Sequence, residues 1–350
     1  MEKEKRLLGL DILKIGCMLM VVCLHSIIYG VGDLNEGWER FFLYFVNAFC
    51  IVAVNCFVLI TGYFVSDSES RNQLKKIRTL WIQVFMYSVG GYIVAALLTK
   101  SFSMAEVIKA VFPYLTDQYW FFTCYILLLA FSPYLNLLIN NMDQKTYKQL
   151  ITIALLLFSV VLSVDIFADW NAFGTRYGYS LLWFMILYII AAYIKRYSVP
   201  QLPFGRLYIG ISVVLGILQS VVTLVSSLDI PIVRLLSIVV NLQMKYTSVP
   251  VVISSLCLFT KALNSYKRFG NKKIEYIITK LAKLSFGVYL FHESCYLRNI
   301  IWEKIDLPCA IIQGNFVSRW ILAIFVIFMT GIVIELARNV IINIIMRVRK

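Results

Sequence analysis

The sequence is short of charge, and this shortage is the first clue to its class. Only 15% of its 350 residues are charged and 60% are hydrophobic, whereas a soluble domain carries about 25% charged residues. The hydrophobic residues form continuous runs and not the alternating pattern of a membrane β-barrel. A soluble domain and a β-barrel are therefore both excluded. The sequence predicts an all-α protein, a polytopic bundle of transmembrane helices.

Patterns that hold metals or disulfides are also missing. The eight cysteines form no CxxC pair, and nearly all lie inside apolar runs, where cysteine usually serves as a small buried hydrophobe. We therefore expect neither a metal site nor a structural disulfide. The first apolar run follows MEKEKR without a small-residue cleavage site, so we expect a retained helix and not a signal peptide.

Apolar runs recur from end to end and predict about ten spans within one domain, residues 1–350. No long linker or low-complexity tract divides them. The short apolar segment 230–243 carries Arg234, so we expect it to lie at the membrane interface or to re-enter the membrane. The ten expected spans are residues 8–30, 41–64, 79–99, 119–140, 149–168, 179–194, 206–228, 246–263, 281–301 and a last one from about 316 past 340.

The net charge of +14 has a topological explanation. Ten spans place both termini on one side, and with the N-terminus inside, most of the 33 lysines and arginines fall on inner segments, as the positive-inside rule requires. The outer loop 31–40 carries Asp33, Glu36 and Glu39 instead. We therefore expect a multi-pass membrane protein with both termini in the cytoplasm and no nucleic-acid partner.

The stretch DILKIGCMLMVVCLH places three ionisable residues, Asp11, Lys14 and His25, in an apolar helix. Lys14 and His25 are eleven positions apart, which is about three full turns, so the two side chains share a face roughly 16 Å apart along the axis. Asp11 lies one turn before Lys14 on nearly the same face. Such groups are costly in lipid, so they are expected to point into the protein or a wet cavity.

The chain has only two histidines, His25 and His292, and both fall in expected spans. Histidine is suited to take a proton from a hydroxyl near neutral pH, and a neighbouring carboxylate orients such a base. Asp11 is too far along the helix to do this for His25. Glu293, next to His292, is a candidate if the fold brings it close. The alternative is that these groups are polar contacts between helices.

Two further clusters stand out. RNQLKKIR, residues 71–78, is expected to be a loop that opens the third span, with Lys75 and Arg78 one turn apart. It serves either membrane topology and anionic lipid or, together with Lys14, the phosphates of a cytoplasmic cofactor. On the outer side, Tyr119, Trp120 and Trp170 fit either an aromatic belt or a surface on which a sugar ring stacks.

Several of these segments together resemble one protein family. LLGLDILKIGCMLMVVCLH resembles the opening helix of the acyltransferase-3 family of integral membrane acyltransferases, in which a basic residue precedes a histidine with ten residues between. Here that pair is Lys14 and His25, with lysine in place of the more usual arginine. VNCFVLITGYFV, KKIR and LSFGVYLFHES resemble later motifs of the family, in the same order along almost the whole chain.

The resemblance implies an enzyme that takes an acyl group, most often acetyl, from acyl-CoA in the cytoplasm and passes it to a hydroxyl of a cell-envelope polysaccharide or its lipid-linked precursor. It implies a catalytic role for His25 and donor contacts from Lys14, Lys75 and Arg78. We add His292 and Glu293 as catalytic candidates and Tyr119, Trp120 and Trp170 as substrate-binding candidates. Acetyl-CoA is the expected donor, without a metal, and membrane lipid surrounds the chain.

Two alternatives remain open at this stage. In the first, Lys14, His25, His292 and Glu293 form an intramembrane path in a transporter or exporter of a glycan or small polar solute. In the second, the chain is a structural partner in an envelope-synthesis complex. The oligomeric state, the glycan and the modified hydroxyl do not follow from the sequence.

Overall fold

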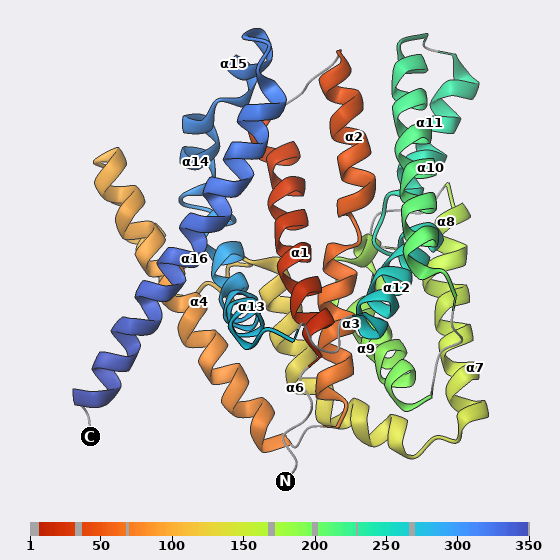
Figure 1. Cartoon of the computed structure of the whole chain (residues 1–350), viewed down its shortest axis with the longest axis horizontal. Helices are drawn as coiled ribbons and strands as arrows, with labels where there is room; N and C mark the ends of the chain where they lie inside the picture. The colour runs from red at the N-terminus through yellow and green to blue at the C-terminus, as the bar shows by residue number, and fades with distance from the viewer. Residues whose placement is uncertain are drawn as a thin grey trace. The chain divides into compact units, whose positions relative to one another are not determined.

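The computed structural model describes residues 7–31, 37–67, 70–166, 172–197, 202–228, 230–265 and 270–348. Every regular element in these ranges is a helix (Figure 1), which confirms the all-α prediction. The chain divides into two compact units built from interleaved stretches. Unit 1 contains Met1–Glu39, Trp81–Tyr119 and Asn264–Lys350, and unit 2 contains Arg40–Leu80 and Trp120–Leu263. The prediction of a single domain stays a prediction.

The helices of each unit are as follows. Unit 1 contains α1 (Leu8–His25), the π-helix η1 (Ser26–Gly30), the later part of α4 (Ser70–Thr99), α5 (Met104–Val111), α13 (Lys272–His292), α14 (Arg298–Ile305), α15 (Leu307–Ile312) and α16 (Phe316–Val348). Unit 2 contains most of α2 (Trp38–Cys50), α3 (Ala53–Val65), the start of α4, α6 (Trp120–Asn140), α7 (Gln144–Leu155), the π-helix η2 (Leu156–Val161), α8 (Leu162–Val164), α9 (Leu181–Arg196), α10 (Phe204–Val225), α11 (Pro231–Gln243) and α12 (Val249–Asn264).

Seven helical segments in the described part of the chain are long and apolar enough to cross a membrane. They correspond to seven of the ten expected spans and are Leu8–Gly30, Trp38–Val65, Gln73–Thr99, Trp120–Asn140, Gln144–Val164, Phe204–Val225 and Phe316–Ile344. The other three expected spans fall on α9, α12 and α13. Two of these, α9 and α12, have 16 residues each, or about 24 Å against a hydrocarbon core of about 30 Å. The segment 230–243 forms the helix α11, and its place at or within the membrane interface stays a prediction.

The second expected span, 41–64, is not one continuous helix. It consists of α2 and α3, which are separated at Ile51 and Val52. Neither glycine nor proline marks this break, so the hydrophobic pattern alone gave no sign of it.

Unit 1 is organised around α13, which packs most extensively against α16 and α1 (Figure 1). A close crossing with α16 is possible because position 331 is glycine: a Cβ added there would lie 2.6 Å from the Cα of Val288. On the α1 side, buried Asp11 accepts a hydrogen bond from the Thr279 hydroxyl at 3.4 Å. These contacts fix α13, which carries His292 at its end.

Unit 2 has its own core, in which α3 packs against α9. Gly62 permits this approach, because a Cβ at this position would lie 2.8 Å from the carbonyl oxygen of Tyr188. Buried Asn55 accepts a hydrogen bond from the indole of Trp183 at 3.1 Å and donates to the carbonyl of Tyr246 at 2.9 Å. Both the oxygen and the nitrogen of the buried Asn55 amide are therefore paired, as burial requires.

Candidate functional site

His25 is the last residue of α1, and the helix widens directly after it. Residues Ser26–Gly30 form a π-helix, η1, and such wide turns are frequent at functional sites. The Ser26 hydroxyl accepts a hydrogen bond from the indole of Trp320 on α16 at 2.8 Å, which anchors the wide turn. The side chain of His25 is 14% exposed, so it is enclosed but reachable.

The second part of the site is the end of α13. The sequence predicted one span over 281–301 that contains His292, but α13 ends at His292, and α14 begins only at Arg298. That prediction was wrong because the apolar run continues through the turn that separates the two helices. His292 is completely buried, and its Nδ1 lies 2.6 Å from the carbonyl oxygen of Val288, one turn back.

The structure brings His25, His292 and Glu293 together. Nδ1 of His25 lies 2.9 Å from Nε2 of His292 and 3.0 Å from Oε2 of Glu293. The sequence named all three residues as catalytic candidates, and the first two are separated by 267 positions. We refer to His25, His292 and Glu293 as the His–His–Glu cluster.

The hydrogen bonds assign the protons in this cluster. A carbonyl oxygen only accepts, so Nδ1 of His292 carries the proton that it donates to Val288. In the neutral ring its Nε2 is then an acceptor, and the proton between the rings belongs to Nδ1 of His25. Nε2 of His25 is left with the lone pair. His25 is therefore held in the tautomer that a general base needs.

Glu293 is held in turn by two groups that the sequence analysis did not single out. Its Oε1 accepts hydrogen bonds from the Tyr29 hydroxyl at 3.2 Å and from the Arg298 guanidinium at 3.3 Å. The same guanidinium lies 4.7 Å from the centre of the Tyr29 ring. The signals available were that Tyr29 follows His25 by about one turn and that Arg298 lies five residues after Glu293. Neither spacing is distinctive without the fold.

The residues expected to contact the acyl-CoA donor lie in different units. In unit 1, Lys14 is 30% exposed, and its Nζ lies 3.9 Å from Oδ1 of Asp11. In unit 2, Lys75 and Arg78 are exposed on the first turns of α4, and not in a loop before it. Their role as phosphate contacts stays a prediction.

The expected sugar-binding aromatics also fall in different places. Tyr119 in unit 1 is 1% exposed, and its hydroxyl donates to the carbonyl of Leu290 at 3.1 Å. Trp120 in unit 2 is partly exposed, and its ring lies 4.4 Å from that of Tyr179 and 6.3 Å from that of Tyr246. Trp170 lies outside the described residues. A role for these residues in sugar binding stays a prediction.

Helices of membrane-spanning length and an enclosed cluster of two histidines and a carboxylate define a polytopic membrane protein with a buried polar site. The chain belongs to the acyltransferase-3 family, because the family model described as "Acyltransferase domain" matches residues 7–337. No curated protein and no solved structure matches the chain. The family match includes stretches of both units and the whole His–His–Glu cluster, so the protein is a membrane acyltransferase.

Proposed function

We propose that this membrane acyltransferase is an O-acetyltransferase that uses acetyl-CoA. The acceptor is a hydroxyl of a cell-envelope polysaccharide or of its lipid-linked precursor, and the protein works in the bacterial cytoplasmic membrane. Family membership supports acyl transfer. The observation that carries the proposal is the contact of Nδ1 of His25 with His292 and Glu293, because it leaves Nε2 of His25 as a base.

In the proposed reaction, Nε2 of His25 takes the proton of the acceptor hydroxyl while the hydroxyl oxygen attacks the carbonyl carbon of the thioester. The carbon–sulfur bond breaks, an ester forms, and the proton passes from His25 to the departing thiolate. His25 carries a positive charge in between, and Glu293 at 3.0 Å stabilises it. His292, itself fixed by its hydrogen bond to the carbonyl of Val288, holds the imidazole of His25 in place.

The remaining roles follow the sequence expectation. Lys14, Lys75 and Arg78 are the proposed contacts of the CoA phosphates, because lysine and arginine bind phosphate oxygens through charge-assisted hydrogen bonds. Trp120, Tyr119 and Trp170 are the proposed contacts of the acceptor sugar.

The test is acetyl transfer by purified protein in detergent, with labelled acetyl-CoA and surface glycan as acceptor. His25→Ala is expected to lower the rate by about 10²–10⁴-fold, which is the usual contribution of a general base. Ile28→Ala, at an exposed position in the following turn, is the matched control and should keep its rate.

Two outcomes contradict the proposal. Full activity of a folded His25→Ala protein would remove His25 as the base. If the wild type transferred no label in detergent but moved solute across sealed vesicles under a gradient, the same buried groups would serve a transporter instead.

A further inference from the structure

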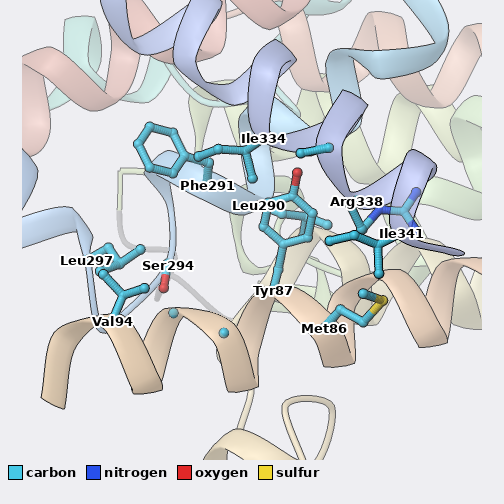
Figure 2. A pocket seen from close by; sticks show the side chains of 13 residues that line it. Met86, Tyr87, Val94, Leu290, Phe291, Ser294, Leu297, Ile334, Arg338 and Ile341 are labelled. Atoms are coloured by element: carbon cyan, nitrogen blue, oxygen red, sulfur yellow. The ribbon is translucent and has the colours of Figure 1, made fainter. Parts of the chain in front are cut away.

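Unit 1 contains a hollow that the proposed reaction does not use. It has a volume of about 410 Å³ and lies between α4, the end of α13 and α16, within the range of roughly 300–1,000 Å³ that is usual for ligand sites. Figure 2 shows Met86, Arg338 and Ile341 at one end and Val94, Ser294 and Leu297 at the other. We refer to this hollow as the α4–α16 groove.

The walls of the groove are apolar, and its charged groups are already paired. The Tyr87 hydroxyl donates to Oε2 of Glu335 at 3.0 Å, and Nε of Arg338 donates to the same oxygen at 2.9 Å. Glu335 is 2% exposed, so this pairing is what makes its burial tolerable. The bonds to Glu335 and Asn339 use Nε and Nη2 of Arg338. A ligand therefore meets a hydrocarbon surface with the remaining guanidinium nitrogen, Nη1, at its end.

Two glycines on α4 form part of the wall. Gly91 lets α4 approach the end of α13, because a Cβ there would lie 2.8 Å from Oγ of Ser294. A Cβ at Gly90 would meet no atom within 4 Å, so position 90 borders open space. A larger side chain at position 90 therefore occupies the groove without a clash in the backbone.

Both α4 and α16 belong to membrane-spanning segments, which restricts what can occupy the groove. From Met86 to Val94 the helix rises about 12 Å, close to the thickness of one hydrocarbon leaflet at about 15 Å. By the expected topology, Arg338 lies toward the cytoplasmic side, and the sequence after it adds Arg347, Arg349 and Lys350. Basic residues at the cytoplasmic end of a membrane segment attract anionic headgroups.

We propose that the α4–α16 groove binds one phospholipid of the inner leaflet, with an acyl chain in the groove and the phosphate at the Arg338 end. The groove and the His–His–Glu cluster share one turn of chain: Ser294 lines the groove, while the preceding Glu293 contacts His25. The acyl chain of the bound lipid therefore packs against the end of α13, next to the His–His–Glu cluster. This is a binding site separate from those of the acyl donor and acceptor.

The test is native mass spectrometry of full-length protein released from detergent, with identification of each retained lipid. Gly90→Leu is expected to lower phospholipid retention on the order of tenfold, because expelling two methylene groups from an apolar site already has this effect. Gly210→Leu is the matched control: position 210 is an exposed glycine of α10 with open space around its Cβ. It should retain lipid as the wild type does.

A second measurement adds dioleoyl phosphatidylglycerol to delipidated protein and follows thermal unfolding. We expect the unfolding temperature of the wild type and of Gly210→Leu to rise, and that of Gly90→Leu to stay unchanged. If Gly90→Leu does not fold, Val94→Trp at the other end of the groove takes its place. Equal retention in all variants, no retained lipid, or a lipid-linked glycan in place of phospholipid would overturn the proposal. His25→Ala should retain phospholipid as the wild type does. A failure of lipid binding can therefore be told apart from a failure of the proposed acyl transfer.

Discussion

Glu293 is the residue on which the contacts of the site converge. It lies beside His25 and accepts hydrogen bonds from Tyr29 and Arg298 through its other oxygen. Hydrogen bonds that involve a charged group are about twice as strong as neutral ones, so Arg298 and Glu293 hold each other in place. The carboxylate thereby keeps a fixed position relative to the imidazole of His25.

The first prediction concerns the charge of this carboxylate. Glu293→Gln keeps the shape and one acceptor oxygen but removes the negative charge that stabilises protonated His25. We expect the rate of acetyl transfer to fall about 10- to 100-fold, or roughly 1.4 kcal/mol of barrier for each factor of ten. Initial rates at saturating acetyl-CoA provide the measurement. Glu303→Gln, at an exposed position on α14, is the control, and equal rates for the two variants would argue against a role for the charge.

Residue by residue, the sequence predicted the ionisable groups but not their partners. Asp11, Lys14 and His25 stand out because charge is rare in an apolar helix. The approach of His292 and Glu293 to His25 joins segments 267 positions apart, and only the packing of α1 on α13 produces it. Tyr29 and Arg298 were missed because neither is unusual for its place in the sequence.

At the level of elements, the crossing of α13 with α16 sets where the cluster forms. The backbones approach closely at Gly331, as small residues allow between membrane helices. His292 lies one turn after Val288, the residue that faces this glycine. A change in the crossing therefore displaces the imidazole as well.

The second prediction tests this crossing. Gly331→Leu places a side chain where even a Cβ would lie 2.6 Å from the Cα of Val288, so α13 and α16 must separate. We expect a loss of about 1–3 kcal/mol of stability, as for other overpacked sites, and a lower unfolding temperature in detergent. Gly210→Leu makes the same chemical change on an exposed surface and should unfold as the wild type does. Identical unfolding of both variants would mean that the crossing tolerates the added bulk.

The hydrophobic runs of the sequence predicted most of the long helices but not where those helices end. Seven of the ten expected spans reappear as long apolar helices of the described residues. The break between α2 and α3 and the end of α13 at His292 both lie within apolar runs. Hydropathy reports which residues avoid water, and a turn buried among helices avoids it as well as a helix does.

For the whole molecule, the number of crossings decides where the termini lie. Ten spans place both termini on one side, whereas the seven segments of membrane-spanning length alone would place them on opposite sides. The two counts differ in whether α9, α12 and α13 also cross the membrane. The excess of basic residues on inner segments favours ten crossings.

The third prediction follows from this count. A reporter that fluoresces only in the cytoplasm is fused to Met1 in one protein and to Lys350 in another. We expect both fusions to fluoresce. Fluorescence from one fusion alone, with both proteins present in the membrane at equal amounts, would mean an odd number of crossings.

The two interleaved units could not be read from the sequence, because no linker or change of composition separates them. Unit 1 draws on three stretches of the chain, with His25 in the first and Glu293 in the last. A ribosome must therefore add 268 residues after His25 before the imidazole meets the carboxylate of Glu293. A nascent chain that stops before α13 contains α1 to α12 but lacks His292 and Glu293. By the proposed mechanism, such a chain cannot yet activate an alcohol.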